Sequence, residues 1–355
     1  MSPTWFRRSK RQATSEKQAV IVGPYRVHNF GDDLIGAIIA KHLQGRGYDV
    51  TVPRLGAENA EWLGTRYAAD YDGILERSEL IVVGGGGIMS DTAGAKPGAS
   101  YLEIVSRAVA DGRITGKPVV VTGVGAGPWV RDKSRKLALE VSDVAEKIGV
   151  RDEESRSHLA SLGVDTDKIV VGADIALLTS DFLQFRPRRV RRIGLQFDIA
   201  NFKDVYENPE ITEVADAVVR YANANARHVT LVSNGRHRSQ LADGAPSCDL
   251  MRYVTLKEFL PQLAGVRAMF TSHLHLAITA YSQRIPSFSL YVREKTKRFY
   301  DQIGHPERAL DLRTATVADF DRLIAQAETV TWTGEDEQRL VRLKSQSRDL
   351  LDFVG

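Results

Sequence analysis

Residues 80–87 read Leu-Ile-Val-Val-Gly-Gly-Gly-Gly, an apolar run that ends in four successive glycines. A short run of aliphatic residues is typical of a strand that is buried on both faces, as in a parallel sheet. Glycine loses more backbone entropy on folding than any other residue, and a hairpin turn needs only two such residues. A flexible hairpin is therefore the weaker interpretation, and we expect a ligand to approach the backbone closely at residues 84–87.

Strand-like and helix-like segments alternate on both sides of this run, which is typical of parallel sheets with crossover helices. In the first half, strands are predicted at residues 19–23, 49–53, 80–84, 118–123, 148–151 and 168–171, and helices near 33–46, 99–112, 131–146 and 153–162. In the second half, strands are predicted at residues 192–197, 228–233, 268–272 and 287–291, and helices near 210–226, 256–263, 274–284, 294–303 and 316–328.

The length of 355 residues favours two domains over a single core. Residues 186–192 read Arg-Pro-Arg-Arg-Val-Arg-Arg, and this polar segment is the predicted linker. It separates a Rossmann-like domain over residues 18–185 from a second one over residues 193–334. A helix over residues 335–355, with leucines at helical spacing, is expected to cross back onto the first domain. The predicted fold class is α/β, with two facing Rossmann-like domains.

The formal charge of +3 is unevenly distributed, because residues 1–17 carry +4 and the remainder carries −1. A near-neutral body argues against a nucleic-acid-binding protein. The basic tail is predicted to be disordered, and weak contact with an anionic membrane surface is the alternative. No apolar run approaches the roughly 20 residues of a membrane span, and the tail lacks the hydrophobic segment of a signal peptide. The single cysteine, Cys248, fits a reducing compartment.

Further candidate residues follow other predicted strands, where open α/β sheets bind their ligands. The first strand leads through Gly31 to Asp32 and Asp33, which either cap the following helix or lie beside an anion at its free N–H groups. The fourth strand ends in residues 123–128, Gly-Val-Gly-Ala-Gly-Pro. That turn lacks the third glycine of the dinucleotide fingerprint, which argues against a nicotinamide-dependent dehydrogenase.

Two histidines, His273 and His275, follow the predicted strand at residues 268–272. As a zinc pair they lack a third ligand nearby, so the sequence predicts no metal cluster, although Asp91 and Asp174 leave room for a loosely held cation. A structural role is the alternative for either ring. A histidine at the carboxyl end of a strand is nevertheless well placed for proton transfer near neutral pH, and His275 is therefore predicted to be catalytic.

A charged stretch follows the next predicted strand. Arg293 and Lys295 lie where that strand ends, so their cationic groups are expected to reach an anion. Lys297 and Arg298 come further along and are expected on a solvated helix face.

Taken together, these segments resemble the polysaccharide pyruvyl transferase family. The family pattern combines a glycine-aromatic-Asn-x-Gly-Asp loop, a Gly-Gly-Gly segment before an Asp, a Gly-x-Gly-x-Gly-Pro turn, Arg-Asp-x-x-Ser, Ala-Asp-x-Ala and a late Arg-Leu-His. The matching residues, over roughly 19–304, are Gly23, Tyr25, Asn29, Gly31 and Asp32; residues 84–87 and Asp91; residues 123–128; Arg151, Asp152 and Ser155; Ala173, Asp174 and Ala176; and Leu274, His275, Pro286, Tyr291 and Lys295. His273 stands where the family usually has arginine before Leu-His.

The resemblance implies a GT-B-like fold and transfer of a pyruvyl group from phosphoenolpyruvate to two hydroxyls of a glycan. The product would be a cyclic ketal, with phosphate released and no cofactor required. The expected catalytic residues are His275 and Asp32, and the expected donor-binding residues are His273, Arg293, Lys295 and Arg236. The acceptor side is expected to comprise Tyr25, Asn29, Gly31, Gly85, Gly86, Gly87, Asp91, Gly125 and Gly127.

The acceptor is expected to be a free or lipid-linked glycan. A cytosolic donor and the lack of an export signal favour a cytoplasmic location, and peripheral contact at the inner face of the membrane through the basic tail is the alternative. Two other functions fit the same segments. One is a nucleotide-sugar-dependent glycosyltransferase of GT-B type, and the other is a non-catalytic relative that binds glycan.

Overall fold

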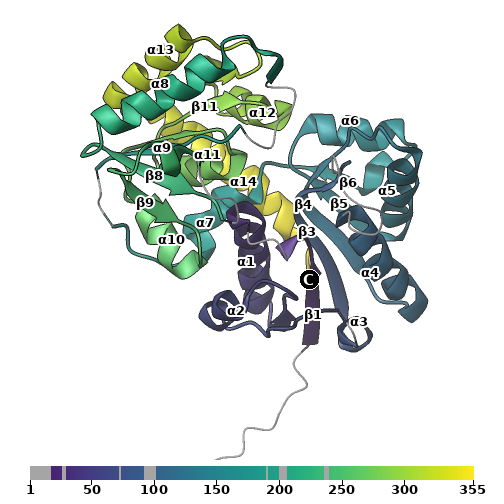
Figure 1. Cartoon of the computed structure of the whole chain (residues 1–355). Helices are drawn as coiled ribbons and strands as arrows, with labels where there is room; N and C mark the ends of the chain where they lie inside the picture. The colour runs from purple at the N-terminus through teal and green to yellow at the C-terminus, as the bar shows by residue number, and fades with distance from the viewer. Residues whose placement is uncertain are drawn as a thin grey trace, which may run out of the picture.

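Two six-stranded parallel sheets form the framework of the protein (Figure 1). The computed structural model describes residues 17–25, 29–71, 73–91, 101–188, 191–199, 206–235 and 240–355. The first sheet has the strand order β2-β1-β3-β4-β5-β6, and the second has the order β12-β11-β10-β7-β8-β9. Both halves are doubly wound, so the predicted α/β class with two Rossmann-like parts is confirmed.

The elements of the first half follow the predicted alternation. They are β1 (Lys17–Val22), α1 (Phe30–Gly45), β2 (Tyr48–Thr51), α2 (Ala57–Leu63), α3 (Ile74–Arg77), β3 (Leu80–Met89), α4 (Tyr101–Thr115), β4 (Val119–Ala126), α5 (Asp132–Val144), β5 (Lys147–Val150), α6 (Glu153–Ser161), β6 (Ile169–Val171), the 3₁₀ turn η3 (Ile175–Leu178) and α7 (Thr179–Phe182). The predicted linker, residues 186–192, lies between α7 and β7.

The second half repeats the pattern. Its elements are β7 (Ile193–Gln196), α8 (Ile211–Ala224), β8 (Val229–Ser233), α9 (Gln240–Gly244), β9 (Asp249–Arg252), α10 (Leu256–Leu263), β10 (Ala268–Thr271), α11 (Leu274–Ser282), β11 (Ser287–Tyr291), α12 (Glu294–Gln302), β12 (Ala309–Asp311), α13 (Val317–Thr329) and α14 (Gly334–Asp352). The short elements α2, α3, α9, β9 and β12 were not predicted from the sequence.

The glycine segment is part of a strand, and the prediction that β3 ends at residue 84 is wrong. β3 continues through the glycines to Met89, and β4 likewise continues to Ala126. The close approach expected there is made by α1. An added Cβ would lie 2.4 Å from Ile39 Cδ1 at Gly84, 2.4 Å from Ile35 Cγ2 at Gly85, and 2.6 Å from Asp32 Oδ1 at Gly86. Glycine therefore lets α1 pack directly on the β3 backbone.

Each sheet has one point where the direction of winding reverses. In the first sheet β1 lies between β2 and β3, and in the second sheet β7 lies between β8 and β10. Crossover helices leave such a pair of strands in opposite directions, so a crevice opens at their carboxyl ends. The loops after β1, β3, β7 and β10 are accordingly where this fold favours a site.

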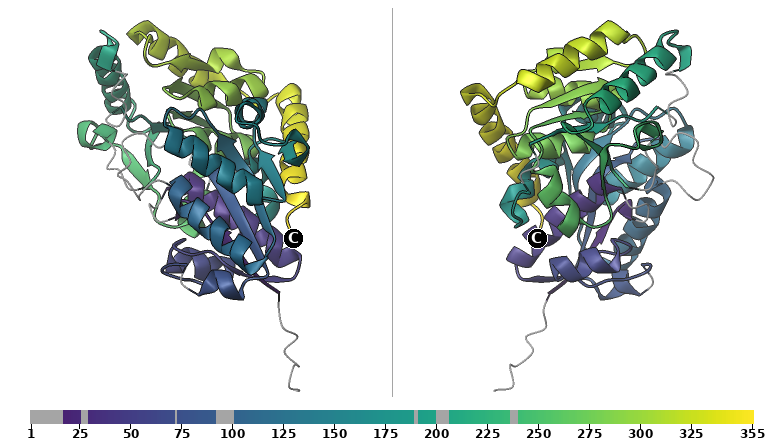
Figure 2. Two further views of the ribbon diagram at one scale, coloured as in Figure 1. Left: turned by 90° about the vertical axis from the view of Figure 1, so that its right-hand side faces the viewer. Right: turned by 60° about the vertical axis from the view of Figure 1, so that its left-hand side comes forward.

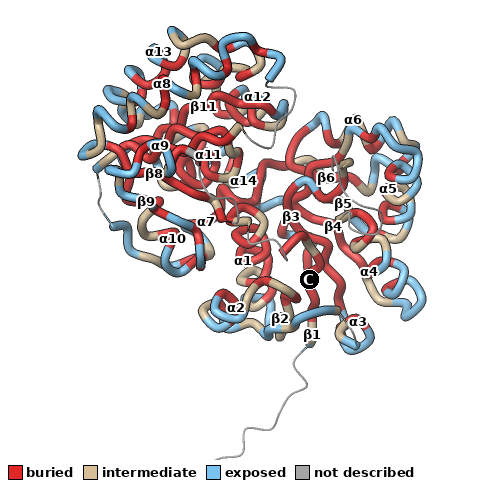
Figure 3. Tube along the Cα trace, viewed as in Figure 1, coloured by how far each residue is buried: buried red, intermediate tan, exposed pale blue. Residues whose placement is uncertain are grey.

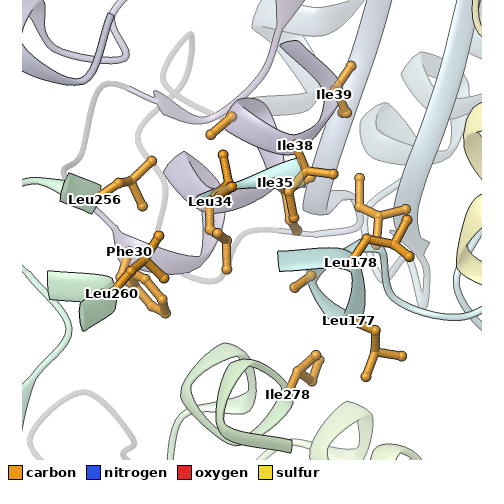
Figure 4. Packing of buried hydrophobic residues seen from close by; sticks show 14 of the residues in the cluster. Phe30, Leu34, Ile35, Ile38, Ile39, Leu177, Leu178, Leu256, Leu260 and Ile278 are labelled. Atoms are coloured by element: carbon orange, nitrogen blue, oxygen red, sulfur yellow. The ribbon is translucent and has the colours of Figure 1, made fainter. Parts of the chain in front are cut away.

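A hydrophobic core joins the two halves. Helix α1 is apolar on almost all sides and is buried, as Figure 3 shows. Leu34 and Ile38 of α1 share a cluster with Leu177 of η3, Leu260 of α10 and Ile278 of α11 (Figure 4). Two further clusters cover the outer faces of the two sheets. The contact between the halves is therefore a continuous packed core.

Helix α14 crosses back onto the first half, as predicted (Figure 2). Its buried leucines join the central cluster, and Ser347 Oγ donates to the backbone oxygen of Asp174 over 3.0 Å. At the chain end, the His42 ring lies 3.1 Å from the backbone oxygen of Val354. None of the helices in the described part of the chain combines the length and apolar character that a membrane span requires.

Candidate functional site

His275 lies in the first turn of α11, where the second half meets the first. Its ring packs on the backbone at Gly31: an added Cβ there would lie 2.0 Å from Nδ1 and 2.6 Å from the His275 Cβ. Nε2 is buried and lies 3.6 Å from Asp174 Oδ2, which is ion-pair distance but longer than a hydrogen bond. The imidazole is thus held between a glycine backbone and a carboxylate.

Asp174 follows β6 and has two roles in this arrangement. Its Oδ1 accepts from the backbone N–H of Ala176 over 3.0 Å, which caps η3. Its Oδ2 accepts from Arg151 Nη1 over 3.2 Å. Burial by itself would raise the pKa of the Asp174 carboxyl, but His275 and Arg151 hold that pKa well below its ordinary value. Asp174 is therefore an ionised partner for the imidazole.

Arg151 follows β5 and is buried beside β4. An added Cβ at Gly125 would lie 2.6 Å from its Nη2, so this glycine makes room for the guanidinium. The Arg151 Nε is 3.9 Å from Asp152 Oδ2. Gly125, which the sequence predicted on the acceptor side, thus supports a cation of the site.

Asp32 lies in the first turn of α1 and is half-buried. Burial raises the pKa of its carboxyl above the ordinary value, although the positive charges of His275 and Lys295 oppose the shift. The missing Cβ of Gly86 makes room for its Oδ1. Asp32 therefore lies close enough to His275 and Lys295 for their charges to affect its pKa.

Lys295 lies in the first turn of α12 and is half-buried. Burial and the nearby Arg151 guanidinium lower the pKa of the Lys295 ammonium to about 8, and Arg293 contributes in the same direction. Within the described part of the chain, its Nζ has no carboxylate at ion-pair distance and makes no hydrogen bond. A partly desolvated ammonium without a paired anion suits an anionic ligand.

The turn before His275 is fixed by a short polar network. Gln196, at the end of β7, accepts from Thr271 Oγ1 over 2.6 Å and from the Ser272 N–H over 3.0 Å. His273 is the N-cap of α11, and its Nδ1 lies 3.0 Å from Asn234 Nδ2. Because that amide nitrogen donates, the neutral His273 ring carries its proton on Nε2.

The loop after β1 is held to the second half by its backbone. The Asn29 side chain accepts from the Gly31 N–H over 3.0 Å and caps α1, a role that had been one of two alternatives for Asp32 and Asp33. The Phe30 N–H donates to the Asn234 backbone oxygen over 3.1 Å. Asp33 accepts from the Tyr253 hydroxyl over 2.6 Å. Asn29 therefore positions Gly31 beneath the His275 ring.

Three residues predicted on the acceptor side make hydrogen bonds, an ion pair or close contacts within the first half. Tyr25 is buried, and its hydroxyl donates to the Gly84 backbone oxygen over 3.0 Å. Asp91 accepts from the backbone N–H of Arg131 over 3.0 Å and pairs with that guanidinium over 3.2 Å. Gly127 has a positive φ and lies against the His158 ring.

The remaining predicted residues are placed as follows. Gly85 and Gly86 lie under α1, whereas Gly87 is exposed. Arg293 is the exposed N-cap of α12, close enough to Lys295 to lower its pKa. Arg236 lies outside the described residues. Among the described residues, no group of three or more His, Cys, Asp or Glu side chains has a metal-site arrangement.

The family model for polysaccharide pyruvyl transferases matches residues 29–294. The chain belongs to that family. This match confirms the resemblance and spans both sheets, from the loop after β1 to the first residue of α12. No curated protein sequence matches the chain.

Solved structures with a similar fold include a complex with UDP and a UDP-GlcNAc 2-epimerase. S. aureus MnaA, in a co-structure with UDP, has a TM-score of 0.61 at 13% identity, covering 94% of this chain and 92% of that one. The UDP-GlcNAc 2-epimerase of Methanocaldococcus jannaschii has a TM-score of 0.61 at 12% identity, covering 94% and 98%. At such identities the likeness shows the fold alone, and it confirms that this pyruvyl transferase family member has a GT-B-like architecture.

Sequence reasoning did not assign Arg151 and Asp174 to the site of this pyruvyl transferase family member. Arg151 had been noted as a match to the family pattern, and Asp174 as such a match and as a residue that leaves room for a loosely held cation. Arg151 follows β5 and Asp174 follows β6. Open α/β sheets bind ligands at the carboxyl ends of their strands, and this criterion, which selected Asp32 and His275, applies equally to Arg151 and Asp174. A surface hollow along α14, lined by Glu335, Gln338, Arg339 and Arg342, involves none of the predicted site residues.

Proposed function

We propose that this chain transfers the pyruvyl group of phosphoenolpyruvate to two hydroxyls of a glycan, forming a ketal and releasing phosphate. The observation that carries the proposal is the placement of His275 against Asp174, beside an ammonium, Lys295, that has no carboxylate at ion-pair distance in the described chain. A proton-transfer group and an anion site therefore meet at the carboxyl ends of both sheets.

The donor carries a carboxylate and a phosphate, so it needs more than one cation. Lys295 presents a partly desolvated ammonium, and Arg293 lies near it at the start of α12. Arg151 adds a buried guanidinium on the opposite side. Cations in a partly dry environment bind a doubly anionic ligand more strongly than they would in water.

The chemistry requires one proton on carbon and two new carbon–oxygen bonds. We assign His275 as the acid that protonates the methylene carbon of the donor, which becomes the methyl group. The cation that develops at the neighbouring carbon is attacked by one sugar hydroxyl, and a second attack follows as the bond to phosphate breaks. Of the two hydroxyl protons, one balances the proton placed on carbon and the other leaves with phosphate.

Asp32 is assigned as the base for the attacking hydroxyl. Its raised pKa makes it a better proton acceptor than an ordinary carboxylate. Asp174 stays ionised, because His275 and Arg151 lower its pKa, and its Oδ2 lies 3.6 Å from Nε2 of the imidazole. The two carboxylates thus have different roles: Asp32, with a raised pKa, accepts a proton, and Asp174, with a lowered pKa, stays charged.

The direct test incubates the full chain with phosphoenolpyruvate and a panel of free and lipid-linked glycans, and measures phosphate together with the mass of the product. The expected result is acceptor-dependent phosphate release and a glycan that gains the mass of a pyruvate ketal. A parallel arm measures thermal stabilisation by phosphoenolpyruvate and by UDP-sugars. Stabilisation by a UDP-sugar alone, without phosphate release, would instead support a nucleotide-sugar-dependent enzyme.

A further inference from the structure

One face of α12 points toward the first half of the protein. Lys295, Arg298 and Gln302 are spaced three and four residues apart and therefore share this face. Gln302 Nε2 donates to the backbone oxygen of Arg151 over 3.4 Å. A second face of the helix is buried in the second half through Thr296 and Phe299.

Arg298 forms two ion pairs on this face. Its Nη1 pairs with Glu154, and its Nε lies 3.5 Å from Asp152 Oδ2. Both carboxylates belong to the start of α6, where Asp152 Oδ1 also caps the helix by accepting from Ser155 N–H over 2.7 Å. The Arg298 guanidinium keeps the pKa of the Glu154 carboxyl below its ordinary value. The expectation that Arg298 lies on a solvated face is therefore wrong.

The contact lies next to the candidate site. Asp152 adjoins Arg151 in sequence, and Arg151 pairs with Asp174 beside His275. Lys295 lies one helical turn before Arg298 on the same face, and it is close enough to Arg151 for that guanidinium to lower its pKa. Any movement of α12 away from α6 would therefore also move Lys295, which is part of α12.

We propose that Arg298, through its ion pairs with Asp152 and Glu154, is a positioning residue that holds α12 against α6 and so places Lys295 for binding the donor anion. This inference rests on the proposed function for the identity of the donor. Its geometric content, that Arg298 controls the environment of Lys295, does not depend on the reaction.

The physical reason is that α12 is attached to the first half by few groups. A long lysine side chain without a partner samples many rotamers, and the ion pair one turn away restricts the helix that carries it. The Lys295 ammonium is expected to bind the donor anion in the ground state as well as in the transition state. Its loss is therefore expected to raise KM for the donor more than it lowers kcat.

The kinetic test compares Arg298→Met with Lys297→Met, a control on the same helix whose ammonium pairs with Asp301 over 2.9 Å on the exposed side. We expect Arg298→Met to raise KM for phosphoenolpyruvate about tenfold and Lys297→Met to leave it unchanged. In a Lys295→Met background, Arg298→Met should add little, because the group it positions is gone. A full additional tenfold in that background would overturn the proposal.

The second readout is independent of turnover. An amine-specific acylating reagent labels lysine only in its neutral form, so the pH dependence of Lys295 labelling, followed by peptide mass spectrometry, reports its environment. Arg298→Met should shift the Lys295 labelling midpoint upward from about 8, and Arg298→Lys should restore it in part. An unchanged midpoint in Arg298→Met would refute the positioning role even if the chain uses another donor.

Discussion

Helices α1 and α12 both bring charged groups to the candidate site, but they are held there by different forces. Helix α1 is buried on nearly all sides, and its side chains fill the space where β3 has glycines instead of larger residues. Helix α12 has an exposed face and reaches the first half mainly through the ion pairs of Arg298. Steric fit therefore fixes Asp32, whereas electrostatic attraction fixes Lys295.

This difference predicts how the α1 side and the α12 side of the site should respond to substitutions and to pH. Packed interiors are nearly incompressible, so an added methyl group on the α1 side must displace its neighbours. The strength of an ion pair at a half-exposed face varies gradually with the charge of the two groups and with salt concentration. We expect abrupt losses from substitutions near α1 and gradual, pH-dependent ones near α12.

Of the two helices, α1 is expected to show the larger effect, with Gly31→Ala. The new Cβ would lie 2.0 Å from the His275 ring and 2.6 Å from its Cβ, so rotating the ring alone does not relieve the clash. We expect turnover to fall about 100-fold or more as the imidazole is displaced, and stability to fall by about 1–3 kcal/mol. Phosphate-release kinetics and thermal unfolding measure the two effects.

Gly45→Ala is the matched control, because Gly45 lies at the other end of α1 and an added Cβ meets nothing within 4 Å. It should leave turnover unchanged and stabilise the helix by about 0.5–1 kcal/mol. If Gly31→Ala proved as active as Gly45→Ala, the close packing of His275 on α1 would be wrong.

A smaller effect is expected from titrating Lys295, whose pKa is about 8. Its folded pKa is lowered, so the ammonium is charged below that value and loses its charge as the pH rises through it. The value of kcat/KM for phosphoenolpyruvate should therefore fall about tenfold between about pH 7 and about pH 9.5. Initial rates at low donor concentration measure it.

Lys295→Arg separates this titration from other causes, since a guanidinium stays charged throughout the range. The variant should lower kcat/KM at neutral pH, because its shape differs, but should remove the decline at high pH. A decline that persists unchanged in Lys295→Arg would show that another group titrates.

The alternation of strands and helices could be predicted because each element is short and bounded by turn residues. The length of β3 could not, since glycine disfavours strands and its reason for being there is a contact with α1, about 50 residues earlier in the chain. The same contact accounts for glycine at positions 85 and 86, because atoms of Ile35 and Asp32 lie where a Cβ would be.

The site was only partly predictable for a related reason. His275 and Lys295 follow strands, and that position alone brought them into consideration. Arg298 was misjudged because its partners, Asp152 and Glu154, lie in the other half of the chain. The sequence does not show which surface a charged residue of a helix faces, so solvent exposure is the default prediction for such a residue.

The central claim is that the imidazole of His275 transfers a proton during pyruvyl transfer, and the turnover of His275→Asn tests it most directly. His228→Asn, at an exposed histidine, is the control. With phosphoenolpyruvate and an accepted glycan, His275→Asn should lower kcat by about 10²–10⁴ while His228→Asn stays at the wild-type rate. A His275→Asn variant that folds normally and turns over at near the wild-type rate would contradict the account.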